Sequence, residues 1–171
     1  DAIAFPGLTA NFDASKAAAL AITLLDWREF GADYAAEMVH TSQALAASLT
    51  DLGVVAYAPK DGITVSHQFA LQAAPYGGGQ AASKHLRRAN ILACGIGLPV
   101  DPVEGDMNGL RIGTPELVRW GMRADHAPEL AARIAGALRS DAPESLAGDT
   151  AAWRATFDRL HFVREAGAPA R

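Results

Sequence analysis

One arginine, Arg111, lies where the pattern of its neighbours predicts a binding site for a carboxylate. It stands between two glycines, Gly109 and Gly113, which permit backbone conformations that other residues would crowd. Thr114 and Pro115 follow directly, and they are expected to be the N-cap and the first residue of a helix. A guanidinium held between a strand and a helix can bind a carboxylate through two parallel hydrogen bonds. We therefore expect Arg111 to bind a ligand that carries a carboxylate.

A structural role for Arg111 is the alternative. The loop before it contains three acids, Asp101, Glu104 and Asp106, and any of them could form an ion pair with the guanidinium. The glycines beside Arg111 favour the binding role, because an arginine at a strand end adds little packing unless a partner needs its planar fork.

The other reactive side chains predict no second site. His67 falls in a predicted strand, where a structural histidine is the default, and Cys94 is expected to be a small buried residue of another strand. The run Gly77–Gly79 is expected to be a flexible surface turn, since no strand, helix and lysine surround it as in a phosphate-binding loop. The remaining histidines have no metal-ligand spacing, so we predict no metal site; they are His40, His85, His126 and His161.

The composition predicts a folded protein without nucleic-acid or membrane partners. The 171 residues are 50% hydrophobic and 20% charged, and the net charge is −4. No block of basic residues stands out, which argues against nucleic acids and anionic membranes as partners. The single cysteine rules out an internal disulfide bond and fits a reducing compartment such as the cytoplasm. No apolar run has the length of a membrane span, and no signal-peptide pattern opens the sequence.

Periodicity predicts an alternation of helices and strands. Residues 13–52 have a helical pattern that starts with an N-cap at Asp13 and that Gly31 is expected to break in two and Gly53 to end. In the second piece one apolar stripe is expected, made of Tyr34, Met38, Leu45, Leu49 and Leu52. Segments 54–58 and 63–73 are predicted strands on either side of a turn. The later predicted elements are a helix at 80–89, a buried strand at 91–96, a strand at 110–113, and helices near 115–122, 128–139 and 149–164. The last helix is expected to dock through Trp153, Phe157 and Leu160, before a frayed tail.

Three segments together resemble serine hydroxymethyltransferases, which are pyridoxal-phosphate enzymes of the aminotransferase-like fold type I. Residues 90–122 are similar to the end of that family, with a proline loop, the stretch Gly-Leu-Arg-Ile-Gly-Thr-Pro and then an Arg-x-Gly that begins at Arg119. Phe5-Pro6-Gly7-Leu8 resembles the family's Phe-Pro-Gly loop. Thr64-Val65-Ser66-His67 resembles the small-domain strand that carries an Asn-His pair. The order and spacing agree over roughly residues 1 to 140.

The resemblance implies an α+β fold, namely the small C-terminal domain of a fold type I enzyme with a long connecting helix at its start. Residues 1–12 would be a loop from the large cofactor domain, and residues 13–52 the connecting helices. Residues 53–165 would form the small domain, and residues 166–171 the tail.

The resemblance also implies that this chain does not hold the cofactor covalently. The lysine of the Schiff base follows a histidine in a threonine-rich setting, which none of Lys16, Lys60 and Lys84 has. We therefore expect no catalytic residue in this chain. Pyridoxal phosphate would be held mainly by an N-terminal large-domain half or a separate large subunit, in a homodimer or heterotetramer.

For the site residues, the resemblance implies that Arg111 binds the α-carboxylate of an amino-acid substrate. His67 and Arg119 would support the active site from behind the residues that touch the substrate, although Arg119 could equally be a solvent or interface residue. The family's Phe-Pro-Gly loop continues to the cofactor phosphate as Gln-Gly-Gly-Pro, which is absent here. Thr9 and Asn11 are the candidate replacement donors.

A further departure bears on the reaction. Ile96 occupies the position of a family asparagine that contacts folate, and an isoleucine would leave a polar edge of the pterin unpaired at a cost of about 1–3 kcal/mol. We therefore expect folate-independent making or breaking of the Cα–Cβ bond of a β-hydroxy amino acid, as in threonine aldolases and transaldolases. The alternatives are a folate-dependent hydroxymethyltransferase and a non-catalytic partner subunit that retains the small-domain fold.

Overall fold

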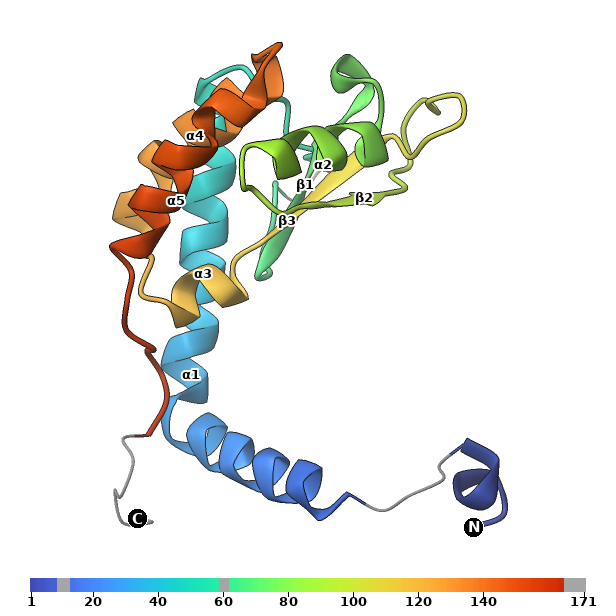
Figure 1. Cartoon of the computed structure of the whole chain (residues 1–171), viewed down its shortest axis with the longest axis vertical. Coiled ribbons are helices and arrows are strands. Elements are labelled where there is room, and N and C mark those ends of the chain that lie inside the picture. The colour runs from blue at the N-terminus through green and yellow to red at the C-terminus, as the bar shows by residue number, and fades with distance from the viewer. Residues whose placement is uncertain (9–12, 59–61, 165–171) are drawn as a thin grey trace. The chain divides into compact units, whose positions relative to one another are not determined.

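The computed structural model describes residues 1–8, 13–58 and 62–164 (Figure 1). The chain forms two compact units, one of Asp1–Ala32 with Phe162–Arg171 and the other of Asp33–His161. Thr9, Asn11 and the predicted tail at 166–171 lie outside the described residues, as does most of the predicted turn after residue 58. A single π-helical turn, Ile3–Leu8, lies within the segment predicted as a loop.

The long helix α1 (Ala14–Asp51) spans the residues that the sequence predicts as helical, 13–52, within one residue at each end. Asp13 accepts a hydrogen bond from the Ser15 N–H at 3.0 Å, as an N-cap residue does. The predicted break at Gly31 is wrong, because the helix passes through this residue. A Cβ on Gly31 would lie 2.7 Å from the ring of Trp27, so the glycine makes room for the indole.

The second part of α1 presents the predicted apolar stripe to the core. Leu52 does not join the stripe, since it is 40% exposed, and Gly53 follows with φ of +75°. The Val54 N–H donates to the Leu49 carbonyl at 2.9 Å, which closes the helix end as the glycine predicts. The buried members of the stripe are Tyr34, Met38, Leu45 and Leu49.

Three antiparallel strands form the sheet, in the order β1-β3-β2. They are β1 (Gln68–Gln72), β2 (Cys94–Ile96) and β3 (Gly109–Gly113). Phe69 pairs with Ile112, and Leu71 with Leu110, and all four side chains are buried on one face. The opposite face of the sheet carries the alternate residues of each strand.

The predicted strand 63–73 is confirmed only over its second half, as β1, and the predicted strand 54–58 is irregular backbone. Segment 54–58 meets β1 through one isolated bridge, between Ala56 and Leu71. The Thr64 hydroxyl donates to the Gln68 carbonyl at 2.6 Å and accepts from the Ser66 N–H at 3.0 Å. These side-chain bonds satisfy backbone groups that a strand ladder would otherwise use, so β1 starts only at Gln68.

Helices of the second unit pack on the apolar face of the sheet and confirm the α+β prediction (Figure 1). The core joins side chains of α1, α2, α4 and the sheet. None of the helices in the described part of the chain is long and apolar enough to cross a membrane. The remaining helices are α2 (Gly79–Arg88), α3 (Pro115–Arg119), α4 (Ala127–Arg139) and α5 (Ala147–Ala155).

The start of α2 lies against β2 and β3 at glycine contacts. A Cβ on Gly79 would lie 2.1 Å from the Gly109 carbonyl oxygen, and one on Gly95 would lie 2.9 Å from the Gln80 nitrogen. Gly78 and Gly79 are buried, so the prediction of a surface turn at 77–79 is wrong for these two residues. The glycines allow helix and sheet backbones to approach more closely than side chains would permit.

Two further predictions need correction. The strand predicted at 91–96 is shorter, and β2 lies at the edge of the sheet, so Cys94 is exposed rather than buried. Helix α5 ends at Ala155, well before residue 164. Trp153 and Phe157 do pack together, with ring centroids 5.2 Å apart, but Leu160 is 52% exposed.

Candidate functional site

Arg111 projects from the face of the sheet that the core does not cover. Leu110 and Ile112 are buried, so alternation along β3 places Arg111 on the opposite face. Its cross-strand partners are Ala70 of β1 and Cys94 of β2, both short side chains. Arg111 is therefore flanked by small side chains on both neighbouring strands, and it is exposed.

An open hollow of about 440 Å³ surrounds this side chain. His67, Cys94 and Gly113 line it together with Arg111, and Pro115 contributes the first turn of α3. The lining contains one guanidinium and no carboxylate. Such a hollow suits a small anionic group, because a carboxylate can accept two parallel hydrogen bonds from the arginine fork.

The structural alternative for Arg111 finds no support among the described residues. No ion pair or hydrogen bond there joins Arg111 to Asp101, Glu104 or Asp106. Asp106 instead accepts hydrogen bonds from the first turn of α2, from the backbone N–H groups of Gln80 and Ala81, each at 2.9 Å. These bonds hold the pKa of the Asp106 carboxyl below its ordinary value.

Asn108 fixes the loop that leads into β3. Its buried side chain accepts the Leu98 N–H at 2.7 Å and donates to the carbonyls of Leu98 at 2.9 Å and Val100 at 3.0 Å. The side chain therefore bonds to backbone on the far side of the loop, three positions before Arg111. From the sequence, Asn108 was expected only to be part of the loop before β3.

Thr114 performs a different function from the predicted helix cap. No side-chain capping bond forms at α3. The buried hydroxyl lies 2.7 Å from the Met38 carbonyl of α1 and 3.0 Å from the His67 carbonyl, and its single hydrogen is shared between them. The Thr114 N–H also donates to the His67 carbonyl, at 2.9 Å. Thr114 thus ties α1, the start of β1 and the end of β3 together.

His67 departs from the prediction of a structural histidine in a strand. It precedes β1, its side chain is exposed, and it lines the same hollow as Arg111. The structure therefore brings together two residues that lie 44 positions apart in the sequence. Only the resemblance to the small-domain strand pointed to His67.

Arg119 does not line this hollow and has a packing role in the described structure. Its guanidinium lies 4.5 Å from the centroid of the Tyr34 ring, and its carbonyl accepts the His161 N–H at 2.8 Å. Gly121 has φ of +96°, and a Cβ there would lie 2.7 Å from Nε2 of His161. The glycine of the Arg-x-Gly motif, Gly121, thus leaves room for the His161 ring. Burial lowers the pKa of His161, and nearby Arg123 and Arg159 add to the effect.

The described residues fit a carboxylate better than a covalently bound cofactor. The hollow around Arg111 has no lysine in its lining. Lys84 lines a different hollow on α2, beside Asp106. Among residues 1–8, 13–58 and 62–164, no three metal-binding side chains are grouped as a metal site.

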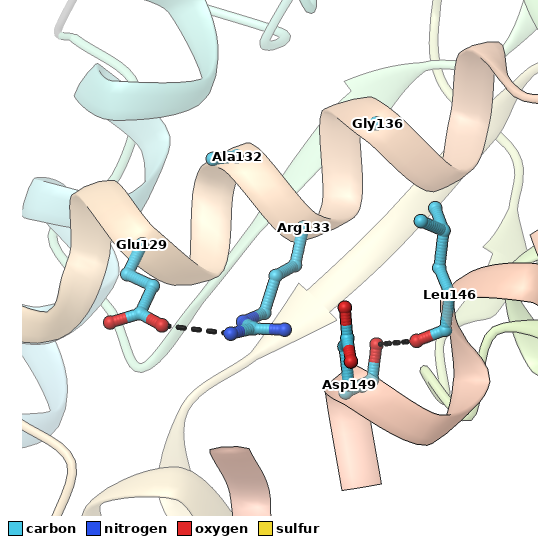
Figure 2. Close-up of a pocket in the computed structure, with 7 residues that line it drawn as sticks. Glu129, Ala132, Arg133, Gly136, Leu146 and Asp149 are labelled. Carbon is cyan, nitrogen blue, oxygen red and sulfur yellow. Dashed lines mark hydrogen bonds and ion pairs between the residues drawn. The ribbon is translucent and has the colours of Figure 1, made fainter. Parts of the chain in front are cut away.

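Another hollow, of about 300 Å³, lies between α4 and α5 (Figure 2). Arg133 is its cationic group, but Glu129 already accepts its Nη2 hydrogen bond at 2.8 Å. The Arg133 guanidinium also stacks over Trp153, 4.9 Å from the ring centroid. Arg133 has partners within the chain, whereas in the described part of the chain no hydrogen bond or ion pair uses the Arg111 guanidinium, so the hollow on the open face of the sheet is the stronger candidate.

Comparisons of sequence place the chain beside two groups of enzymes, while no family model matches it. It is 55% identical to an alpha-methylserine aldolase of Ralstonia sp over 165 residues, which cover 96% of this chain and 38% of that protein. An alpha-methylserine aldolase of Variovorax paradoxus is 53% identical, with 95% and 37% covered. A serine hydroxymethyltransferase of Pyrobaculum calidifontis is 37% identical, with 92% and 37% covered. The chain thus spans less than two fifths of these relatives' length.

The fold agrees with a solved structure. The crystal structure of L-threonine transaldolase from Pseudomonas fluorescens in its internal aldimine state matches with a TM-score of 0.80. The match covers 93% of this chain and 36% of that one, at 24% sequence identity. At this identity the likeness establishes the fold of the chain, which is that of a portion of the larger enzyme.

Proposed function

We propose that this chain, which belongs to the family of serine hydroxymethyltransferases and alpha-methylserine aldolases, is the substrate-carboxylate-binding part of a pyridoxal-phosphate enzyme. The enzyme would make or break the Cα–Cβ bond of a β-hydroxy amino acid. The observation that carries the proposal is Arg111, which is exposed, has no carboxylate partner among the described residues, and lies in a hollow whose lining has no acid.

The role of this chain is to bind and orient the substrate. Arg111 would hold the α-carboxylate and so fix the direction of the Cα–Cβ bond. In cleavage the β-hydroxyl loses its proton, the bond breaks, an aldehyde departs and Cα takes up a proton. Pyridoxal phosphate supplies the electron-accepting chemistry for such reactions. It would be held by the N-terminal large-domain half or by a separate large subunit, and Thr9 and Asn11 would contribute donors toward it.

Folate independence is the favoured form of this proposal. Ile96 lies on the same face of the sheet as Arg111, since both alternate with buried residues. Its side chain cannot hydrogen-bond a pterin. The higher identity to alpha-methylserine aldolases than to serine hydroxymethyltransferases supports the same conclusion. A substrate such as α-methylserine would then yield alanine and formaldehyde.

Assembly and location complete the proposal. Since active sites shared between subunits are typical of the resembled family, we expect a homodimer or a heterotetramer in the cytoplasm. Arg119 would hold its segment in place through Tyr34 and His161 rather than touch the substrate.

The test replaces Arg111 in the complex with its large-domain partner. Arg111→Ala should lower kcat/KM for α-methylserine about 100-fold, because a hydrogen bond to a charged group contributes about 1.5–3 kcal/mol. Arg111→Lys should recover only part, since an ammonium lacks the fork. Arg87, exposed on α2, is the matched control, and Arg87→Ala should leave the kinetics unchanged. Activity of Arg111→Ala within threefold of the parent would exclude the carboxylate role.

The alternatives give different results in the same preparation. A turnover that requires added tetrahydrofolate would indicate a folate-dependent hydroxymethyltransferase. A complex that binds no pyridoxal phosphate, judged from its visible absorbance, would indicate a non-catalytic partner subunit.

A further inference from the structure

We propose that His67 is a second substrate-binding residue, whose imidazole donates a hydrogen bond to the carboxylate that Arg111 binds. This inference rests on the proposed function and adds a residue to the same site. It assigns to His67 direct contact with the substrate, in place of the supporting role that the resemblance to serine hydroxymethyltransferases implies.

The backbone of His67 is fixed relative to the strand that bears Arg111. Gln68 pairs with Gly113, so His67 stands opposite Thr114 just beyond the ladder. The His67 carbonyl accepts the Thr114 N–H at 2.9 Å and lies 3.0 Å from the Thr114 hydroxyl. These bonds fix the backbone from which the His67 side chain extends, as a residue that positions a substrate requires.

The imidazole of His67 has hydrogen-bonding capacity to spare. Within the described parts of the chain, no hydrogen bond or ion pair joins its ring to another residue, and the side chain is exposed at the hollow. Other histidine rings are used internally. Nε2 of His85 lies 3.0 Å from the Ala137 carbonyl, and Nδ1 of His126 accepts the Arg123 N–H at 3.1 Å.

The chemistry of the carboxylate leaves room for this extra donor. Two carboxylate oxygens offer about four lone-pair positions, and the arginine fork uses two of them. A neutral imidazole carries one N–H, which can donate to a third position. Arg111 lies on β3 and His67 immediately before the neighbouring strand β1, and both line one hollow of about 440 Å³, where we expect them to bind a single small anion together.

The experiment compares ligands with and without the carboxylate, in the complex with the large-domain partner. The ligands are α-methylserine and 2-amino-2-methyl-1,3-propanediol, in which a hydroxymethyl group replaces the carboxylate. His67→Ala should raise KM for α-methylserine about tenfold with kcat within twofold. The inhibition constant of the diol should change less than twofold. His67→Gln, which keeps a donor, should recover most of the affinity.

Matched variants separate contact from folding. His40 is an exposed histidine of α1 that does not line this hollow, and His40→Ala should behave as the parent. His67→Met removes the donor while retaining side-chain bulk, so it replaces His67→Ala if the latter fails to fold.

Each result discriminates. An unchanged KM in His67→Ala or His67→Met, beside a large loss in Arg111→Ala, overturns the role of His67 and leaves the proposed function standing. Equal losses for α-methylserine and the diol indicate a structural residue and also overturn the inference. If Arg111→Ala is fully active as well, the proposed function itself fails.

Discussion

Thr114→Val tests whether one buried hydroxyl holds the site together. Valine preserves the shape of threonine and removes the hydroxyl that lies 2.7 Å from the Met38 carbonyl and 3.0 Å from the His67 carbonyl. The His67 carbonyl would keep the Thr114 N–H, whereas the buried contact to Met38 would be lost. Removing one partner of a buried hydrogen bond costs about 1–3 kcal/mol.

The expected change in stability is measurable. A loss of about 1–2 kcal/mol lowers Tm by roughly 4–7 °C for a unit the size of Asp33–His161. Circular dichroism of the chain gives Tm, and steady-state kinetics of the complex give KM. We also expect KM for α-methylserine to rise, because Thr114 links His67 to the strand that bears Arg111.

A matched threonine provides the control. Thr150 is also buried, but its hydroxyl donates within its own helix, to the Leu146 carbonyl at 2.9 Å. Thr150→Val should therefore lower Tm less than Thr114→Val and leave KM unchanged. Equal shifts in the two variants, or a Tm for Thr114→Val within 1 °C of the parent, would refute the idea that Thr114 joins the three elements.

Two other predictions concern the packing and charge around α2. Gly79→Ala should prevent a cooperative thermal transition or lower Tm by more than 10 °C, since its Cβ would lie 2.1 Å from the Gly109 carbonyl oxygen. The control is Gly136→Ala on α4, where a Cβ would have no atom within 4 Å; it should be neutral or stabilise the protein by about 0.5–1 kcal/mol. A Gly79→Ala protein with unchanged Tm would show that the contact at Gly109 relaxes easily. Asp106→Asn should destabilise the protein at pH 7, and because the pKa of Asp106 is lowered from 3.8 in the fold, its contribution is present above that pH and lost as pH falls further. Urea unfolding at pH 7 and near pH 3 checks this, and a difference from the parent that stays constant with pH would contradict it.

Local sequence signals were sufficient for the long elements. The N-cap at Asp13, the apolar stripe of α1 and the stop at Gly53 depend on neighbours within a turn or two, and all are confirmed except that Leu52 does not join the stripe. The predicted break at Gly31 was wrong. The helix continues through this residue, and the glycine is there because the ring of Trp27, one turn earlier, occupies the space that a Cβ would need. Helix propensity alone cannot distinguish these two uses of glycine.

The errors in the site come from contacts distant in sequence. Thr114 has the composition of a helix cap, and nothing nearby reveals the Met38 carbonyl that its hydroxyl meets. Cys94 was expected to be buried because apolar residues surround it in the sequence. It is exposed because β2 is an edge strand and because Cys94, like its partner Arg111 on β3, lies on the face of the sheet that the core does not cover. Arg111 was predicted from its own motif, and Gly113 and Pro115 of that motif line the same hollow, whereas its small neighbours Ala70 and Cys94 come from other strands.

The amide of Asn108 determines how the loop between β2 and β3 can change during evolution. Because one side chain bonds to backbone at Leu98 and Val100, the base of the loop has a fixed circumference, and an inserted or deleted residue between these points and Asn108 must be absorbed at the tip. Gly105, with φ of +74° and open space around it, marks that tip. We expect length variation among relatives to be confined to this tip. Changes in loop length would then leave the position of Arg111 on β3 unchanged.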